Sequence, residues 1–312
     1  MDTYIAADIG GTKLRVAVFP SHGVEPIHQK RIPTKGKGST LERLFELITE
    51  LWPNDGRVKG LAAAFPGPID PYAGILLSAP NIPGWDQLPL QQLLHDRFQV
   101  PVAVGNDANL AALGEWRYGA GQGHHNLVYL TISTGIGGGV IINDHLLLGQ
   151  RGLAAELGHV TILPDGPLCG CGQRGHLETV GSGTGIAYHF NEERAKGRNS
   201  ILPLSPPASA RDISKAADTG DLLAQEAMGR GGYYVGLGIA NYLMIFNPSI
   251  VILGGGVSRA GKWFYDSLRK SMNEHAMRPE YVADLVVTQA ALGDNSGLMG
   301  ALALARELTP GR

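Results

Sequence analysis

Cysteine is nearly absent from this chain: two occur in 312 residues, and both stand in the short run Cys169-Gly-Cys171. A separation of two positions is poor geometry for a disulfide between them, which argues against a disulfide-stapled secreted domain. The N-terminal segment from Met1 to Ile5 has no basic stretch followed by an apolar one, so we expect no export signal. The protein is therefore predicted to be cytoplasmic.

Long hydrophobic runs and an excess of one charge are also missing. The most apolar stretch, from Ile239 to Val251, is interrupted by Asn241, Asn247 and Pro248, so no segment reaches transmembrane length. The formal net charge of -2 gives no field that would recruit nucleic acid or an anionic membrane. We therefore expect a small-molecule partner, with neither nucleic acid nor a membrane among the partners.

Glycine, in contrast, is plentiful, with 44 residues that cluster in short loops after apolar runs. Such loops are where a backbone turns sharply or approaches a ligand. The length of 312 residues exceeds a comfortable single core and favours two domains with a cleft between them. Strand–glycine turn–strand patterns begin at Tyr4 and again at Asn126. We interpret them as one architecture used twice, with the boundary near residues 118–125.

The elements between the two hairpins are typical of an α/β layer in which helices cover a mixed sheet. After the first hairpin we expect a helix with a capping box at Ser39 and Glu42, strands at 58–65 and 101–104, and a helix at 109–116. The polar, proline-containing segment from Asn191 to Ala210 is expected to be a surface loop.

Three glycine runs are candidate nucleotide contacts. In Asp8-Ile-Gly-Gly-Thr-Lys13 the backbone N–H groups can converge on an anion, while the Thr12 hydroxyl and the Lys13 charge add to the attraction. The run from Thr134 to Gly139 repeats this arrangement, and Gly254-Gly255-Gly256 suits close approach to an adenosine. The alternatives are a plain hairpin turn for the first two and tight strand–helix packing for the third. The candidates are Asp8, Gly10, Gly11, Thr12, Lys13, Thr134, Gly135, Gly137, Gly255 and Gly256, with Asp8 also a candidate magnesium holder.

Asp107 is the candidate general base. It stands with Asn106 where a strand gives way to a helix, and phosphoryl transfer needs a carboxylate that accepts the proton of the acceptor hydroxyl. The alternative is that Asn106 or Asp107 only caps the helix. Carboxylates and amides commonly form hydrogen bonds with sugar hydroxyls. Asn81, Glu156 and Glu178 are further candidate side chains of these two types.

The segment around the two cysteines predicts a metal site. His159 precedes Cys169 by ten positions, Cys171 follows by two, and His176 by five more. Two imidazoles and two thiolates form the ligand set of a closed tetrahedral zinc site, although free cysteines beside surface histidines are the alternative. A structural zinc there would fix Glu156 and Glu178, which flank the loop.

Taken together, Asp8-Ile-Gly-Gly-Thr-Lys13, Glu156-Leu-Gly-His159 and the run from Cys169 to Glu178 resemble the ROK family, and above all its glucose-phosphorylating members. The resemblance is colinear over nearly the whole chain. It implies an actin-like ATPase (ribonuclease H-like) fold with two lobes, each a mixed β-sheet flanked by helices. Residues 1–117 would form the small lobe, completed by a C-terminal helix at 298–312, and residues 118–297 the large lobe.

The resemblance also implies phosphorylation of a free hexose, most of all glucose, at its 6-hydroxyl by ATP with Mg²⁺, a structural Zn²⁺, and a homodimer. His159 would be both a zinc ligand and a sugar neighbour, while the family usually has a third cysteine where this chain has His176. The implied sugar contacts are Gly67, Asn81, Asn106, Asp107, Glu156, His159 and Glu178.

Other functions stay open at this point. Fructose, mannose or an N-acetylhexosamine could replace glucose, because one moved group changes pocket shape more than motif. The family also includes sugar-sensing repressors with an N-terminal helix-turn-helix, whereas here the first strand is expected from about Tyr4. Chaperone or filament proteins of the wider fold would lack the sugar-binding residues.

Overall fold

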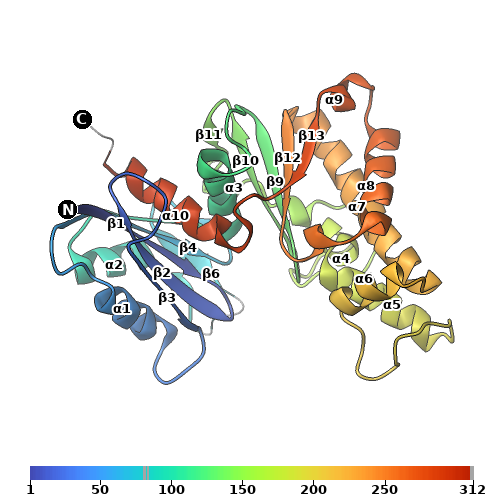
Figure 1. The fold of residues 1–312 in the computed structure, drawn as a ribbon, viewed down its shortest axis with the longest axis horizontal. Coiled ribbons are helices and arrows are strands. Elements are labelled where there is room, and N and C mark those ends of the chain that lie inside the picture. Colours follow the sequence, from blue (N-terminus) through green and yellow to red (C-terminus); the bar gives the residue numbers. More distant parts are fainter. Residues whose placement is uncertain (80–81, 83, 310–312) are drawn as a thin grey trace.

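The computed structural model describes residues 1–79, 82 and 84–309 and has two halves, each built on a five-stranded sheet (Figure 1). The strand orders are β3-β2-β1-β4-β8 in the first half and β11-β10-β9-β12-β13 in the second. The strands of the first sheet are β1 (Asp2–Ile9), β2 (Lys13–Pro20), β3 (His28–Pro33), β4 (Arg57–Phe65) and β8 (Val102–Asn106). Those of the second are β9 (Leu127–Ile132), β10 (Ile136–Ile142), β11 (His145–Leu146), β12 (Ile250–Gly254) and β13 (Val286–Gln289).

The two sheets have the same topology. In each one, the first three strands form an antiparallel meander, and the remaining two add parallel to the first strand of that meander. Both sheets are therefore mixed, and the prediction that one architecture is used twice is confirmed.

Helices cover these sheets as the periodicity of the sequence requires. The capping box of α1 (Thr40–Glu50) is present: Ser39 Oγ accepts from the Glu42 N–H at 3.2 Å, and the Glu42 carboxylate accepts from the Ser39 N–H at 2.9 Å. The long α7 packs against α8 on the second sheet's side of the molecule. The other helices are α2 (Leu90–Phe98), α3 (Asp107–Tyr118), α4 (Leu177–Gly181), α5 (Gly183–Ala195), α6 (Ala210–Asp218), α7 (Leu222–Phe246), α8 (Lys262–His275), α9 (Glu280–Ala283) and α10 (Ser296–Glu307).

Helix α3 lies between the two sheets, because small residues let it approach its neighbours closely. A Cβ on Gly139 of β10 would lie 2.5 Å from Ala112 Cβ, and one on Gly137 would lie 2.9 Å from Ala108 Cβ. On its other side, α3 packs against α10, where a Cβ on Gly300 would lie only 1.6 Å from a backbone oxygen of α3. Figure 1 shows α10 lying beside α3 on the first sheet, to which the chain returns after β13.

Several expectations about elements were wrong. Residues 191–195 belong to α5, so the expected surface loop begins after Ala195, and α6 already begins at Ala210. The C-terminal helix begins at Ser296 and ends at Glu307 rather than spanning 298–312. Helix α2 and the small sheet of β5 (Ile69–Asp70), β6 (Ile75–Ser78) and β7 (Asp86–Leu88) were missed because these segments are short and weakly periodic. Among the described residues, no helix is both long and apolar enough to cross a bilayer.

Candidate active site

The first glycine hairpin is an open turn between β1 and β2. The Gly10 N–H donates to the Lys13 carbonyl at 2.9 Å, and the side chains of Thr12 and Lys13 are exposed. Thr34, which follows β3, holds this turn from the side: its hydroxyl donates to the Gly10 carbonyl at 2.5 Å and its N–H to the Thr12 carbonyl at 2.8 Å. Thr34 was missed because β3 was not predicted.

Asp8 lies half-buried at the end of β1, opposite Arg15 in the β1–β2 register. The Arg15 guanidinium donates through Nε to the Asp8 carboxylate at 3.0 Å and through a terminal nitrogen to Asn295 Oδ1 at 3.2 Å. Arg15 was not among the predicted site residues, although its position across the hairpin from Asp8 could have indicated the pair.

Asp107 is the first residue of α3, and Asn106 caps the helix. Asn106 Oδ1 accepts from the N–H groups of Ala108 and Asn109 at 3.0 and 3.1 Å, while its Nδ2 donates to the Gly67 carbonyl at 3.0 Å. Asn106 therefore caps α3 and links the start of this helix to Gly67. Gly67 itself has a φ of 102°, and a Cβ there would lie 2.4 Å from a backbone oxygen, which accounts for the glycine.

The carboxyl group of Asp107 has a pKa well above that of an ordinary aspartate. Burial raises its pKa to about 7, and the negative charges of Asp8 and Glu156 add to the increase. Asp8 belongs to the first sheet and Glu156 to the second half of the chain, so the fold brings together carboxylates that the sequence keeps far apart. A carboxyl group with a pKa near neutrality can exchange a proton with a substrate hydroxyl at physiological pH.

The second glycine hairpin differs from the first. The Glu178 carboxylate accepts from the Ile136 N–H at 2.9 Å, and a Cβ on Gly135 would lie 2.1 Å from the same carboxylate oxygen. Gly137 faces α3, as described above. Thr134 is exposed at the turn.

The third glycine run has one glycine that is required by the local packing and one with open space beside it. Gly255 has a φ of 81°, and a Cβ there would lie 2.4 Å from the Ile132 carbonyl oxygen. At Gly256, a Cβ would meet nothing within 4 Å. Of this pair, Gly256 is the residue with open space beside it.

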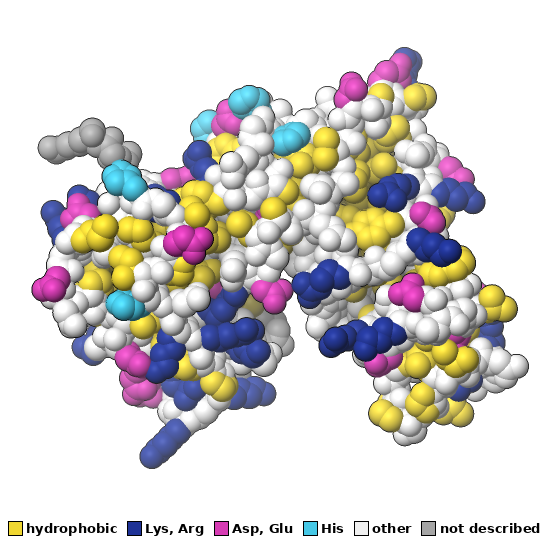
Figure 2. Space-filling model, in the orientation of Figure 1, with side chains coloured by type: hydrophobic (Ala, Val, Ile, Leu, Met, Phe, Trp, Pro, Cys, Tyr) yellow, Lys and Arg dark blue, Asp and Glu magenta, His cyan; other side chains and the backbone are white. Residues whose placement is uncertain are grey.

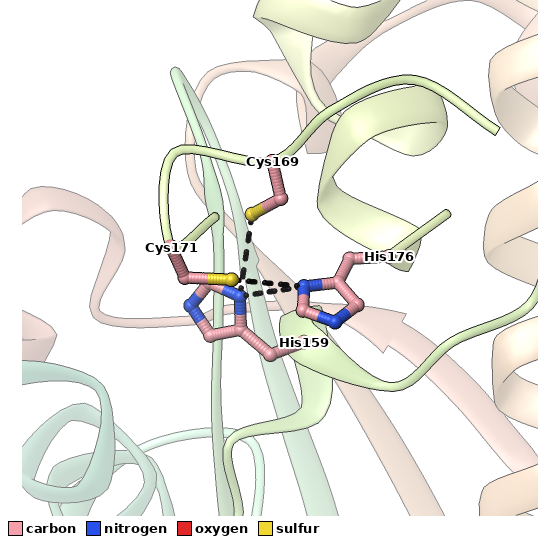
Figure 3. A group of neighbouring side chains, drawn as sticks. All are labelled: His159, Cys169, Cys171 and His176. Carbon is pink, nitrogen blue, oxygen red and sulfur yellow. Dashed lines mark hydrogen bonds between the residues drawn. The ribbon is translucent and has the colours of Figure 1, made fainter. Parts of the chain in front are cut away.

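Four side chains converge in the predicted metal loop, and Figure 3 shows them pointing toward one another. The Nδ1 atoms of His159 and His176 lie 3.2 Å apart, Cys169 Sγ lies 3.6 Å from His159 Nδ1, and Cys171 Sγ lies 3.4 Å from His176 Nδ1. Zinc bonds of about 2.0 Å to nitrogen and about 2.3 Å to sulfur give tetrahedral edges of about 3.3 and 3.5 Å. The donor set and its spacing therefore fit a tetrahedral zinc ion.

The metal loop adjoins the acidic residues of the site. The Cys169 thiol lies 3.7 Å from Glu178 Oε1, so Glu178 contacts the loop with one oxygen and the second hairpin with the other. Burial raises the pKa of Glu156, with the Glu178 charge raising it further and the charge of His159 lowering it. Glu156, His159 and Glu178 are thus neighbours, as the sequence predicted, whereas Asn81 lies outside the described residues.

Two mixed sheets of equal topology, with helix α3 packed between them, define a protein of the actin-like ATPase fold. The ROK family model matches residues 4–308, and the chain belongs to the ROK family. A glucokinase of Thermotoga maritima is 38% identical, with 97% of each chain covered.

Solved structures agree with this assignment. The ROK hexokinase of Thermus thermophilus aligns with a TM-score of 0.81 at 33% identity, over 99% of this chain and 100% of that one. A ROK family glucokinase of Streptomyces griseus, solved in complex with glucose and AMPPNP, aligns with a TM-score of 0.79 at 33% identity, over 98% of this chain and 99% of that one. The predicted family and fold class are confirmed.

Proposed function

We propose that this protein is an ATP-dependent hexose kinase that phosphorylates the 6-hydroxyl of glucose, with Asp107 as the general base. The observation that carries the proposal is the half-buried Asp107 carboxyl group at the first position of α3, whose pKa is raised to about 7 by burial and by the charges of Asp8 and Glu156. The similarity to glucokinases over nearly the full chain supports the choice of glucose.

The residues of the site have separate roles in proton transfer, sugar binding and nucleotide binding. Asp107 accepts the proton of the attacking hydroxyl, and its place at the start of a helix held by the Asn106 cap keeps the carboxylate fixed. Glu156, His159 and Glu178 orient the sugar from the other half of the molecule, while Gly67 and Asn106 shape the first side. Thr12, Lys13, Thr134 and Gly256 contact the nucleotide, and Asp8 is the residue suited to hold Mg²⁺, which neutralises phosphate charge when bound.

The surface of the molecule suits such a nucleotide. Figure 2 shows a notch between the two halves, with Lys and Arg side chains on both of its walls. Cationic walls raise the local concentration of a polyphosphate and speed its association. We further propose that the halves are residues 1–117 with α10 and residues 118–295, and that they close on the sugar about residues 117–123.

A panel assay tests the activity. Release of ADP should depend on added hexose and be fastest with glucose among glucose, mannose, fructose and N-acetylhexosamines. A protein that binds glucose but releases no hexose-dependent ADP would instead act as a sugar sensor. ATP hydrolysis of equal rate with and without hexose would contradict a kinase altogether.

Zinc is the proposed structural metal of His159, Cys169, Cys171 and His176. Metal analysis of protein purified without chelators should find one zinc per chain, and the Cys169→Ala variant should contain little. Equal metal content in the two proteins would contradict this site.

A further inference from the structure

The two segments that connect the halves of the molecule meet at one buried carboxylate. The chain leaves α3 through residues 119–126 to reach β9, and it returns from β13 through residues 290–295 to reach α10. Glu115, on the last turns of α3, is fully buried and touches both connections.

Each Glu115 oxygen accepts two hydrogen bonds. Oε2 accepts from the N–H groups of Ala120 and Ala291, both at 3.0 Å. Oε1 accepts from the Leu292 N–H at 2.9 Å and from the Ser296 hydroxyl at 2.8 Å. The four donors are uncharged, and three of them are backbone groups whose direction the chain fixes. A buried carboxylate held in this way ties the first connection, the second connection and α3 to a common point.

The backbone of the same residue adds to this junction. The Glu115 carbonyl accepts from the N–H groups of Gly119 and Gly121 at 3.0 and 2.9 Å. A Cβ on Gly119 would lie 2.1 Å from Glu115 Oε2, so a glycine is needed for the connection to wrap around the carboxylate. The side chain and the main chain of one residue thus order the connection together.

Two segments connect Glu115 to the proposed reacting groups. Helix α3 leads to Asp107, two turns earlier on the same helix. The second connection leads to Asn295, whose side chain accepts from Arg15, the partner of Asp8. The base and the proposed magnesium holder therefore both depend on segments that Glu115 joins.

We propose that Glu115 is a positioning residue for phosphoryl transfer, which aligns Asp107 with Asp8 by joining the two connections between the halves. This inference rests on the proposed kinase function. Glu115 does not bind the hexose or the nucleotide, so its loss should lower kcat and leave hexose binding nearly unchanged. A misplacement of about 1 Å can cost up to about a hundredfold in rate.

Glu115→Gln is the test variant. The amide has the same shape, but its NH₂ group cannot accept, so in either orientation at least one backbone N–H loses its acceptor. Asp221→Asn is the matched control, because the Asp221 carboxylate is also buried and accepts from Ala224, Ile201 and Ser200, yet it caps α7 away from both connections. Both variants should lose stability, and only Glu115→Gln should lose kcat, by about tenfold or more.

Hexose affinity, measured by calorimetry, should stay within about threefold of wild type in both variants. Equal losses of kcat in the two variants, or an unchanged kcat in Glu115→Gln, would overturn the proposal. If Glu115→Gln does not fold, Ser296→Ala, which removes a single donor, should lower kcat in the same direction by a smaller factor. An unchanged kcat in Ser296→Ala would then count against the proposal.

Hydrogen exchange separates this proposal from the proposed function. In Glu115→Gln or Ser296→Ala, amides of both connections should exchange about tenfold faster together. Unchanged exchange would overturn the junction even in an active kinase. A wild-type protein without hexose-dependent ADP release would overturn the kinase function instead, and accelerated exchange in both connections would then leave Glu115 as a junction of the two halves.

Discussion

The two glycine hairpins occupy equivalent places in the two sheets, yet the structure uses their glycines differently. In the first hairpin, the turn at Gly10 is open, with Thr12 and Lys13 exposed beside it. In the second, Gly137 and Gly139 face α3, and the space beside Gly135 is filled by Glu178. A Cβ would have room at Gly10 in the first hairpin, whereas in the second hairpin a helix or a carboxylate occupies the space that a Cβ would need.

This difference teaches that a repeated motif need not have a repeated function. The second hairpin contributes to the site mainly by packing against α3, the helix that begins with Asp107. Changes in the second hairpin should therefore affect stability and rate together, whereas changes in the first should affect nucleotide binding alone.

The largest effect is expected at Asp107, the first residue of the helix that packs against the second hairpin. Asp107→Asn keeps the shape but removes the proton acceptor, so kcat should fall by at least about a hundredfold, while sugar affinity changes much less. Steady-state kinetics and calorimetry measure the two quantities, and the exposed Asp55→Asn is the control. A kcat near that of wild type would remove Asp107 from the mechanism.

Acidification should have the next largest effect. Because the base must be deprotonated and burial raises the pKa of Asp107 to about 7, kcat/KM for hexose should fall about tenfold per pH unit below that value. It should level off at higher pH. Glu156→Gln removes one of the charges that raise this pKa, so its acid limb should move to lower pH. An unmoved limb would show that Glu156 does not act on Asp107.

Substitution in the second hairpin should come next. A valine at Gly139 would collide with Ala112 and with the Ala108 carbonyl, which should lower the free energy of unfolding by about 1–3 kcal/mol and reduce kcat by displacing α3. Denaturant unfolding measures the first change. Gly256→Ala, at a glycine with open space around it, should keep wild-type stability and raise the KM for ATP. If both variants were equally stable, the two uses of glycine would not be distinct.

The smallest effect is expected in the first hairpin. Thr12→Ala removes one exposed hydroxyl, so the KM for ATP should rise by about two- to tenfold, with unchanged stability. A loss of stability would mean that Thr12 supports the turn instead of the nucleotide. Thr34→Ala offers the comparison, since the buried Thr34 hydroxyl does hold the turn and its loss should lower stability.

The sequence could predict those features of this molecule that depend on residues close together in the chain. The capping box at Ser39 depends on residues three apart, and the metal cluster lies within eighteen positions, from His159 to His176. The strands around both glycine turns show in local hydrophobic patterns. Such features need few long-range contacts, so residue type and spacing are sufficient to indicate them.

The tertiary structure alone decided which groups act on one another across the chain. The packing of Gly139 against Ala112, the Glu178 bond to Ile136 and the four bonds of Glu115 join segments between 5 and 181 positions apart. No periodicity encodes these partners, because they depend on how two sheets and a helix come together. The sequence by itself determined the two repeated hairpins and the spacing of the His/Cys cluster. The tertiary structure decided that the second hairpin packs against α3. It also decided that burial and the charges of Asp8 and Glu156 raise the pKa of Asp107.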